Sequence, residues 1–185
     1  MRFFDIFPTV SFFILALMIT GQSIFLKKKG VPIRSKAKKS AFSKYILYPT
    51  FVLILILLIS ELLKPAFQIP LFILPGWLSN NLVESKFFQM SGVLLITVSL
   101  LFMGFTLRNF KTSLRFGMDS YNLGKLITTG VFSISRNPFF VSIELYFLGI
   151  VLFFSNAFFI SIALLTIVSI HFFILKEEKF LLKNY

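Results

Sequence analysis

The strongest constraint on this chain is a series of five long apolar segments that carry almost no charge. Among its 185 residues 57% are hydrophobic and Phe alone occurs 27 times, so too few polar side chains remain to cover a water-soluble domain. An apolar helix of about 20 residues matches the hydrocarbon core of a bilayer. We therefore predict an all-α integral membrane protein that forms a single membrane domain over residues 1–185.

The predicted organisation is three N-terminal spans within residues 1–107, followed by a polar loop, a C-terminal helical hairpin and a short tail within 108–185. The fourth segment is short for a full span. The five predicted segments are 7–26, 45–63, 87–107, 139–154 and 157–175.

Two features qualify this pattern. The apolar connection 64–86 contains Pro65, Pro70 and Pro75, which make a regular spanning helix unfavourable, so we expect it at the membrane interface or as a shallow re-entrant piece. In the third segment, Gly92 and Gly104 are expected to allow close approach of a neighbouring helix.

The basic residues predict the orientation of these spans. Of the 19 Lys and Arg residues, 16 fall in the loop after the first segment, the loop after the third segment and the tail. Cytoplasmic loops carry an excess of Lys and Arg. We therefore expect the N-terminus outside and the C-terminus in the cytoplasm, with localisation in a bacterial-type inner (cytoplasmic) membrane. The basic loop 27–44 can also attract anionic lipid head groups.

Composition also excludes several classes of function. The net charge of +12 is distributed between apolar segments and not over a folded polar face, so nucleic acid is not an expected partner. The chain has no Cys and only one His, His171, which argues against disulfides and most zinc, haem and Ser-His chemistry. No metal site is predicted.

Polar residues suited to chemistry gather at the two ends of the C-terminal hairpin. The loop contains Thr129-Gly130-Val131-Phe132 and then Ser135-Arg136-Asn137-Pro138-Phe139-Phe140, while Glu177-Glu178 follows the last segment. On the predicted topology both regions face the cytoplasm. A connection of about thirty residues is long, and long ordered loops are more often functional.

These motifs, with Gly149 and Ser155-Asn156, resemble the isoprenylcysteine carboxyl methyltransferases, which are related to the membrane phospholipid methyltransferases. The resemblance covers about residues 90 to 185. It implies methyl transfer from S-adenosylmethionine to a lipophilic acceptor that arrives from the bilayer. Asn137 stands where the family usually has His. Phe132 and Phe140 stand where the family usually has Tyr. Phe173 occupies the place of an Arg in the prenylcysteine enzymes.

The resemblance also implies roles for individual residues. Catalytic roles fall on Arg136, Glu177 and Glu178. The expected cofactor-binding residues are Gly124, Lys125, Leu126, Ile127, Phe132, Asn137, Pro138, Phe139 and Phe140. The donor's chemistry agrees with these residue types, because an aromatic ring attracts a sulfonium cation and a carboxylate can pair with an ammonium. Aligned methyl transfer needs little acid or base help when the acceptor is already ionised.

Several residues keep a second interpretation. Asn137-Pro138 is also sufficient as a helix start with a polar cap. Glu144, within the fourth segment, is either a functional carboxylate or a side chain that reaches water at the interface. We interpret His171 as a packed or interfacial side chain in preference to a catalytic base.

Two alternative functions remain open. Membrane sterol reductases share a similar hairpin and use NADPH, for which Lys111, Arg115 and Lys125 could bind a phosphate. A non-catalytic membrane scaffold could also retain this fold. A binding assay in which S-adenosylmethionine and NADPH compete would distinguish the two enzymes. If substitution of Arg136, Glu177 and Glu178 left the affinity for a cofactor unchanged, the scaffold would be favoured.

Overall fold

The computed structural model describes residues 3–30, 43–68, 73–110, 130–133, 135 and 137–184, and these residues are almost entirely helical. Four helices are long and apolar enough to cross a membrane, and a fifth apolar helix of 17 residues is shorter. The predicted all-α membrane fold is therefore confirmed. In chain order the elements are α1 (Phe3–Lys28), the π-helix η1 (Ser43–Leu47), α2 (Tyr48–Phe67), α3 (Gly76–Ser79), α4 (Lys86–Phe110), the 3-10 helix η2 (Gly130–Ser133), α5 (Pro138–Phe154) and α6 (Ala157–Asn184).

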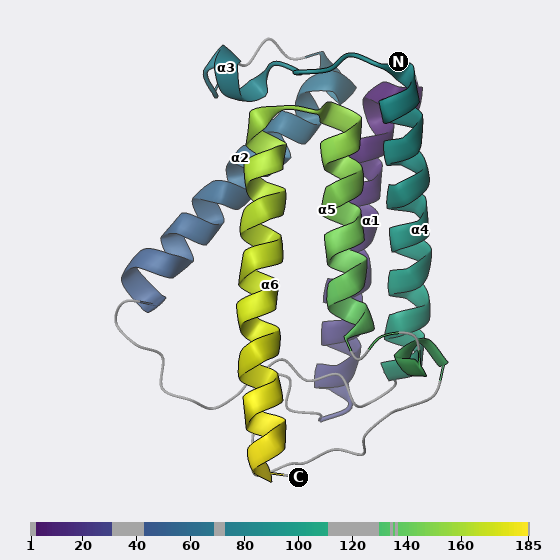
Figure 1. Cartoon of the computed structure of the whole chain (residues 1–185), viewed down its shortest axis with the longest axis vertical. Coiled ribbons are helices and arrows are strands. Elements are labelled where there is room, and N and C mark those ends of the chain that lie inside the picture. The colour runs from purple at the N-terminus through teal and green to yellow at the C-terminus, as the bar shows by residue number, and fades with distance from the viewer. Residues whose placement is uncertain are drawn as a thin grey trace.

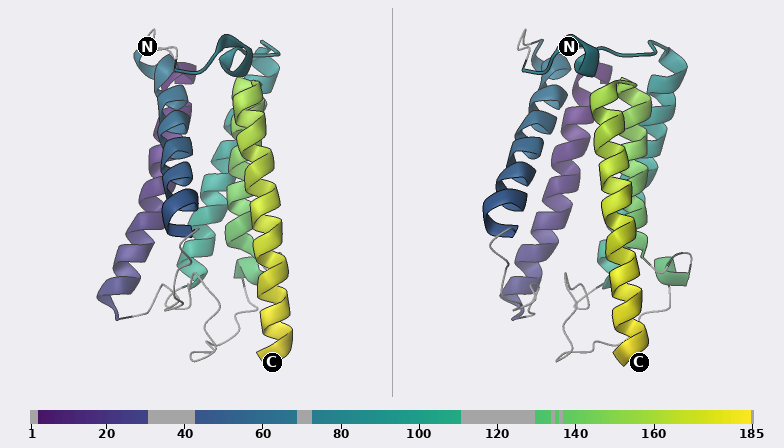
Figure 2. Two further views of the ribbon diagram at one scale, coloured as in Figure 1. Left: turned by 90° about the vertical axis from the view of Figure 1, so that its left-hand side faces the viewer. Right: turned by 60° about the vertical axis from the view of Figure 1, so that its left-hand side comes forward.

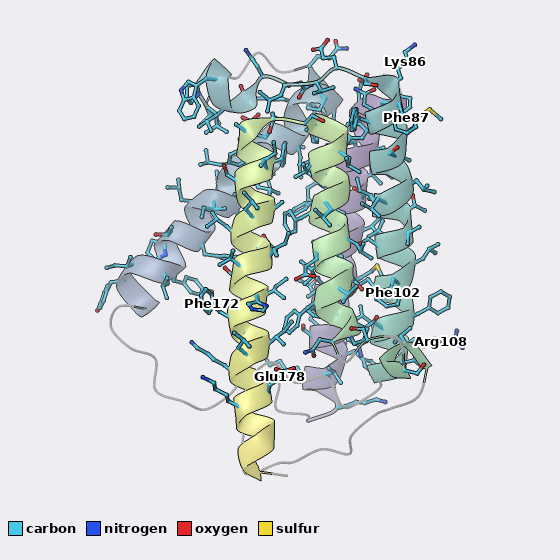
Figure 3. The ribbon with its side chains drawn as sticks, viewed as in Figure 1. Lys86, Phe87, Phe102, Arg108, Phe172 and Glu178 are labelled. Carbon is cyan, nitrogen blue, oxygen red and sulfur yellow. The ribbon has the colours of Figure 1, made fainter. Side chains whose placement is uncertain are left out.

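The long helices alternate in direction, so that the two ends of the chain lie at opposite ends of the bundle (Figures 1 and 2). Lys86 and Arg108 mark the two ends of α4, and α6 carries Glu178 to the end where Arg108 lies (Figure 3). Large apolar side chains such as Phe87 stay exposed along the helices, as expected for surface that contacts lipid. Which end faces the cytoplasm remains a prediction from charge.

The closest helix pair is α4 and α5, which meet through glycine. A Cβ built on Gly92 would lie 2.7 Å from the Gly149 carbonyl oxygen and 2.8 Å from the Phe153 backbone nitrogen. Only hydrogen fits at such a separation, so the two backbones touch directly. Farther along the pair, buried Ser99 donates a hydrogen bond of 2.7 Å to the Ser142 carbonyl. These contacts fix where α5 begins.

Two buried hydroxyl groups attach the N-terminal helix to the rest of the bundle. Thr9 on α1 donates a hydrogen bond to the Leu62 carbonyl on α2. The hydroxyl of Ser11, two residues farther along the same helix, lies 3.1 Å from the Tyr146 hydroxyl on α5. Hydroxyl groups that have left water need such partners, and here the partners belong to different helices. These bonds therefore help to set the relative positions of α1, α2 and α5.

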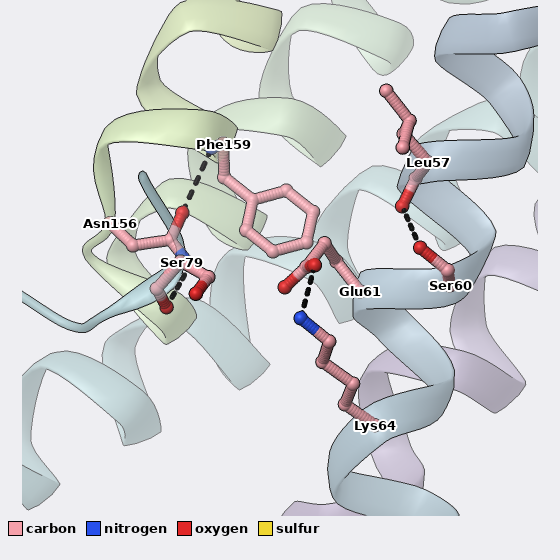
Figure 4. Close-up of polar contacts among 7 residues, drawn as sticks. All are labelled: Leu57, Ser60, Glu61, Lys64, Ser79, Asn156 and Phe159. Carbon is pink, nitrogen blue, oxygen red and sulfur yellow. Dashed lines mark hydrogen bonds and ion pairs between the residues drawn. The ribbon is translucent and has the colours of Figure 1, made fainter. Parts of the chain in front are cut away.

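The connection before α4 lies across one end of the bundle and holds the α5–α6 turn (Figure 4). Buried Asn156 donates to the Ser79 carbonyl at 3.2 Å and accepts a bond of 2.9 Å from the Phe159 backbone, which caps α6. Glu61 and Lys64 form an ion pair nearby at the end of α2. The described part of this connection therefore lies beside the turn between α5 and α6, and whether it is interfacial or re-entrant stays a prediction.

Two expectations about the helices were wrong in detail. The second segment does not end at residue 63, because α2 continues through Pro65 to Phe67, where the left-handed backbone of Gln68 stops it. The last span was expected to end at about residue 175, and the candidate span Ala157–Lys176 confirms this, although the helix itself continues to Asn184. Gly104 faces only the mobile end of Met18, at 3.4 Å from a built Cβ, so it does not bring two backbones together as Gly92 does.

We predict that Gly92→Ala lowers the free energy of unfolding by about 1–3 kcal/mol, because the added methyl must push the backbone of α5 away. The matched control is Gly21→Ala in α1, where nothing lies within 4 Å of the new methyl. That change should be neutral or stabilising by about 0.5–1 kcal/mol. Chemical unfolding in detergent measures both variants, and equal stability of the two would contradict the glycine contact.

Candidate active site

The predicted site residues at the start of α5 lie against the last helix. Pro138 occupies the first turn of α5 and is fully buried, and Phe139 is buried beside it, whereas Asn137 and Phe140 are partly exposed. The Asn137 side chain makes no capping hydrogen bond, so the expected polar cap is absent. The Asn137 backbone N–H instead donates to the Ser135 hydroxyl at 3.3 Å.

Three aromatic rings connect α5 with α6 at this end. The Phe139 and Phe140 centroids are 5.7 Å apart, and the Phe140 and Phe173 centroids are 5.4 Å apart, both with edge-to-face geometry. Phe140 thus lies between a buried ring of its own helix and a ring of α6. These three rings form an aromatic wall at this end of the hairpin, and the face of an aromatic ring, not its edge, is what attracts a cation.

The acidic pair lies on the same side of the fold as this wall. Glu177 and Glu178 follow Phe173 on α6 after about one turn, because the helix continues unbroken past the apolar segment. Glu178 is exposed at the end of the bundle that also contains the end of α4 (Figure 3). The structure therefore brings Asn137, Phe140 and Glu178 to one end of the molecule, as the sequence predicted.

The segment η2 approaches this site from the end of α4 (Figure 1). Gly130 has a φ of +70°, a left-handed conformation that favours glycine, and the Asn109 amide lies 3.1 Å from where its Cβ would be. Val131 is buried. Gly130 of the predicted loop motif therefore has a structural role, and Asn109 is a neighbour that no spacing in the sequence indicated.

Several predicted residues cannot be placed. Gly124, Lys125, Leu126, Ile127 and Arg136 lie outside the described residues. Phe132 and Glu177 are placed only by their backbones, in η2 and α6.

Other features of the described residues do not add to this site. No group of three or more His, Cys, Asp or Glu among them could hold a metal ion. A shallow apolar groove of about 340 Å³ lies between α1 and α4, lined by Met18, Leu100, Leu101, Gly104, Phe105 and Arg108. None of the predicted site residues lines this groove.

Comparison with known protein families matches residues 87–185, more than half of the chain, to the phospholipid methyltransferase family. The chain belongs to this family. The match begins at α4 and includes the glycine contact, the aromatic wall and the acidic pair. The family includes isoprenylcysteine carboxyl methyltransferase, so the resemblance stated from the motifs is confirmed. No curated protein and no solved structure matched the chain.

This phospholipid methyltransferase family member is accordingly an integral membrane protein and a membrane methyltransferase. The N-terminal part of the chain, with α1, α2 and α3, lies before the matched region. It is nevertheless joined to the matched helices by hydrogen bonds between Ser11 and Tyr146 and between Asn156 and Ser79. The N-terminal helices therefore support the hairpin that presents the candidate site.

We predict that Phe173→Leu lowers the free energy of unfolding by about 0.5–1.5 kcal/mol, the usual range for an aromatic pair beyond its buried area. The control is Phe172→Leu, since Phe172 is 61% exposed and lies on the side of α6 away from α5 (Figure 3). Chemical unfolding of both variants in the same detergent checks this. If Phe172→Leu proved the more damaging change, the placement of the aromatic wall would be refuted.

Proposed function

We propose that this protein transfers a methyl group from S-adenosylmethionine to a lipid acceptor at the cytoplasmic face of the membrane. The family match over α4, α5 and α6 is the observation that carries the proposal. The aromatic and acidic residues that the family resemblance assigns to the donor lie together at one end of this hairpin. The basic residues of the sequence favour the cytoplasm for that end.

The described residues fit a methyl donor of this chemistry. S-adenosylmethionine supplies an electrophilic methyl group on a sulfonium when bound, and carries an ammonium on its amino-acid part. Phe140 and Phe173 present the π-surface that would attract the sulfonium. The Glu178 carboxylate would pair with the ammonium. The protein's contribution is then positioning and exclusion of water, which need no nucleophile of its own.

The acceptor is proposed to be a lipid for two reasons. The helices that carry the site expose apolar side chains to the bilayer, including Leu148, Leu164 and Leu165, so an acceptor can approach from the membrane. Phe173 also occupies the place where the prenylcysteine enzymes have Arg, and it packs on Phe140. At this position an acceptor carboxylate would meet an aromatic ring in place of a guanidinium, which favours a lipid over an isoprenylcysteine-like substrate.

The reductase alternative has less support. The matched family consists of methyltransferases. The reductase's phosphate-binding candidates Lys111, Arg115 and Lys125 lie outside the described residues, so their positions count neither for nor against it. The third possibility, a scaffold that has lost activity, is tested by the binding experiment below.

We predict that S-adenosylmethionine raises the melting temperature of the purified protein in detergent, because a ligand of the folded state stabilises it by about 2.7 kcal/mol at one hundred times its dissociation constant. Glu178→Gln should weaken donor binding about 10- to 100-fold, as expected for loss of a charge-assisted hydrogen bond of about 1.5–3 kcal/mol.

Glu84→Gln is the matched control for this experiment, because Glu84 is exposed in the connection before α4, at the opposite end of the bundle. Its donor affinity should equal that of the unmodified protein. A melting temperature raised by NADPH and unchanged by the methyl donor would support the reductase instead. No shift with either compound in well-folded protein would favour the scaffold.

A further inference from the structure

The shallow groove between α1 and α4 is separate from the residues proposed to bind the methyl donor. It has a volume of about 340 Å³, and on the α1 side it is bordered by Met18. On the α4 side its residues recur at the spacing of one helix face, and they are Leu100, Leu101, Gly104, Phe105 and Arg108. The groove is therefore apolar along its length and cationic at one end.

Gly104 keeps this groove open. A Cβ built on Gly104 would lie 3.4 Å from the terminal methyl carbon of Met18, so the glycine borders only a flexible side chain. The helices α1 and α4 run in the same direction and are farther apart at their C-terminal ends (Figures 1 and 2). Nearer the start of α1, Ser11 attaches this helix to α5. The groove thus lies where α1 and α4 separate.

The length of the groove matches one acyl chain of one leaflet. Between Leu100 and Arg108 the rise along α4 is about 12 Å, at about 1.5 Å per residue. A leaflet contributes about half of a hydrocarbon core of about 30 Å. Arg108 is the first charged residue after the uncharged stretch 87–107, which places it at the level of the head groups. Because Leu101 and Phe105 are exposed, the outer side of the groove is open to lipid.

The charges at this end of the groove favour an anionic head group. Arg108 is exposed, and within the part of the chain that the structure describes no ion pair or hydrogen bond joins its side chain to another residue. The last turn of α1 adds Lys27 and Lys28. No acidic residue occurs over residues 19–28 or 100–110. A guanidinium forms paired hydrogen bonds with a phosphate, and nearby Lys side chains attract anionic lipid.

We propose that this groove binds an anionic phospholipid that is not a substrate, with one acyl chain along Met18 and Gly104 and its phosphate at Arg108. The inference goes beyond methyl transfer and does not depend on it. Asn109 follows Arg108 and lies beside Gly130 of η2. The bound lipid would therefore hold α1 against the end of α4 that η2 contacts.

The experiment uses the full chain purified in detergent and measures its melting temperature with dioleoyl phosphatidylglycerol, dioleoyl phosphatidylcholine or inorganic phosphate. We predict that phosphatidylglycerol raises the melting temperature, because a ligand of the folded state stabilises it by mass action. Phosphatidylcholine has the same acyl chains without a net negative charge and should give a much smaller rise. Inorganic phosphate should give none, because it has no chain to fill the groove.

Two variants test the two parts of the site, with lipid affinity measured by native mass spectrometry. Arg108→Gln removes the cation and should weaken the binding of phosphatidylglycerol about 5- to 10-fold, as expected for one basic side chain beside an anionic lipid. Gly104→Leu keeps the charge but places a side chain in the groove. It should weaken binding at least as much, because the acyl chain then has no room.

Each variant has a matched control. Lys86→Gln removes an exposed cation from the opposite end of α4, and Val168→Leu adds apolar bulk to the exposed surface of α6. Both controls should bind phosphatidylglycerol as the unmodified protein does. The melting temperature of each variant without lipid shows whether it is folded.

A last measurement separates this lipid from a methyl acceptor. After incubation with S-adenosylmethionine, the phosphatidylglycerol recovered from the protein should have an unchanged mass, and a gain of one methyl group would overturn the proposal. Equal shifts with the two lipids would also overturn it, as would a comparable shift with inorganic phosphate. Unchanged phosphatidylglycerol affinity in either Arg108→Gln or Gly104→Leu would overturn the assigned position of the lipid.

Discussion

The direct backbone contact between Gly92 and Gly149 is the constraint on which the site depends. It brings α4 and α5 closer than side chains would permit, and the Ser99 bond to the Ser142 carbonyl holds the pair farther along. The position of α5 decides where Pro138 begins the helix and therefore where Phe140 lies. Because α4 also contacts η2, the same packing determines which end of the bundle receives the loop before α5.

The second requirement is a hairpin with a single register. Asn156 caps α6 and bonds the Ser79 carbonyl, while the Leu82 N–H donates to the Ser155 carbonyl at 2.8 Å. The turn is thus held from outside by the connection before α4. A turn with a fixed position keeps the far ends of its two helices aligned. This allows Phe140, 15 residues before Ser155, to meet Phe173, 17 residues after Asn156.

Sequence predicts the helices well, because a membrane span must be long, apolar and uncharged. It predicts their ends less well. Pro65 suggested a break, yet a proline so near the end of α2 costs little, and Gln68 ends the helix instead. The motif containing Gly149 was recognised without its packing role, because the partner, Gly92, is identified only by how two helices face each other. The same limit hid the position of Asn109 beside Gly130.

The arrangement of polar and aromatic groups along α6 agrees with a site at the end of this hairpin where α6 carries its charged residues. Glu178 is exposed and lies five residues beyond Phe173, or about 7.5 Å along the helix. The rings of Phe140 and Phe173 lie between this carboxylate and the apolar remainder of the seam. In the proposed function the donor's ammonium would meet Glu178 on the water side, and its sulfonium would lie at the rings, where water is scarce and π-electrons attract a cation.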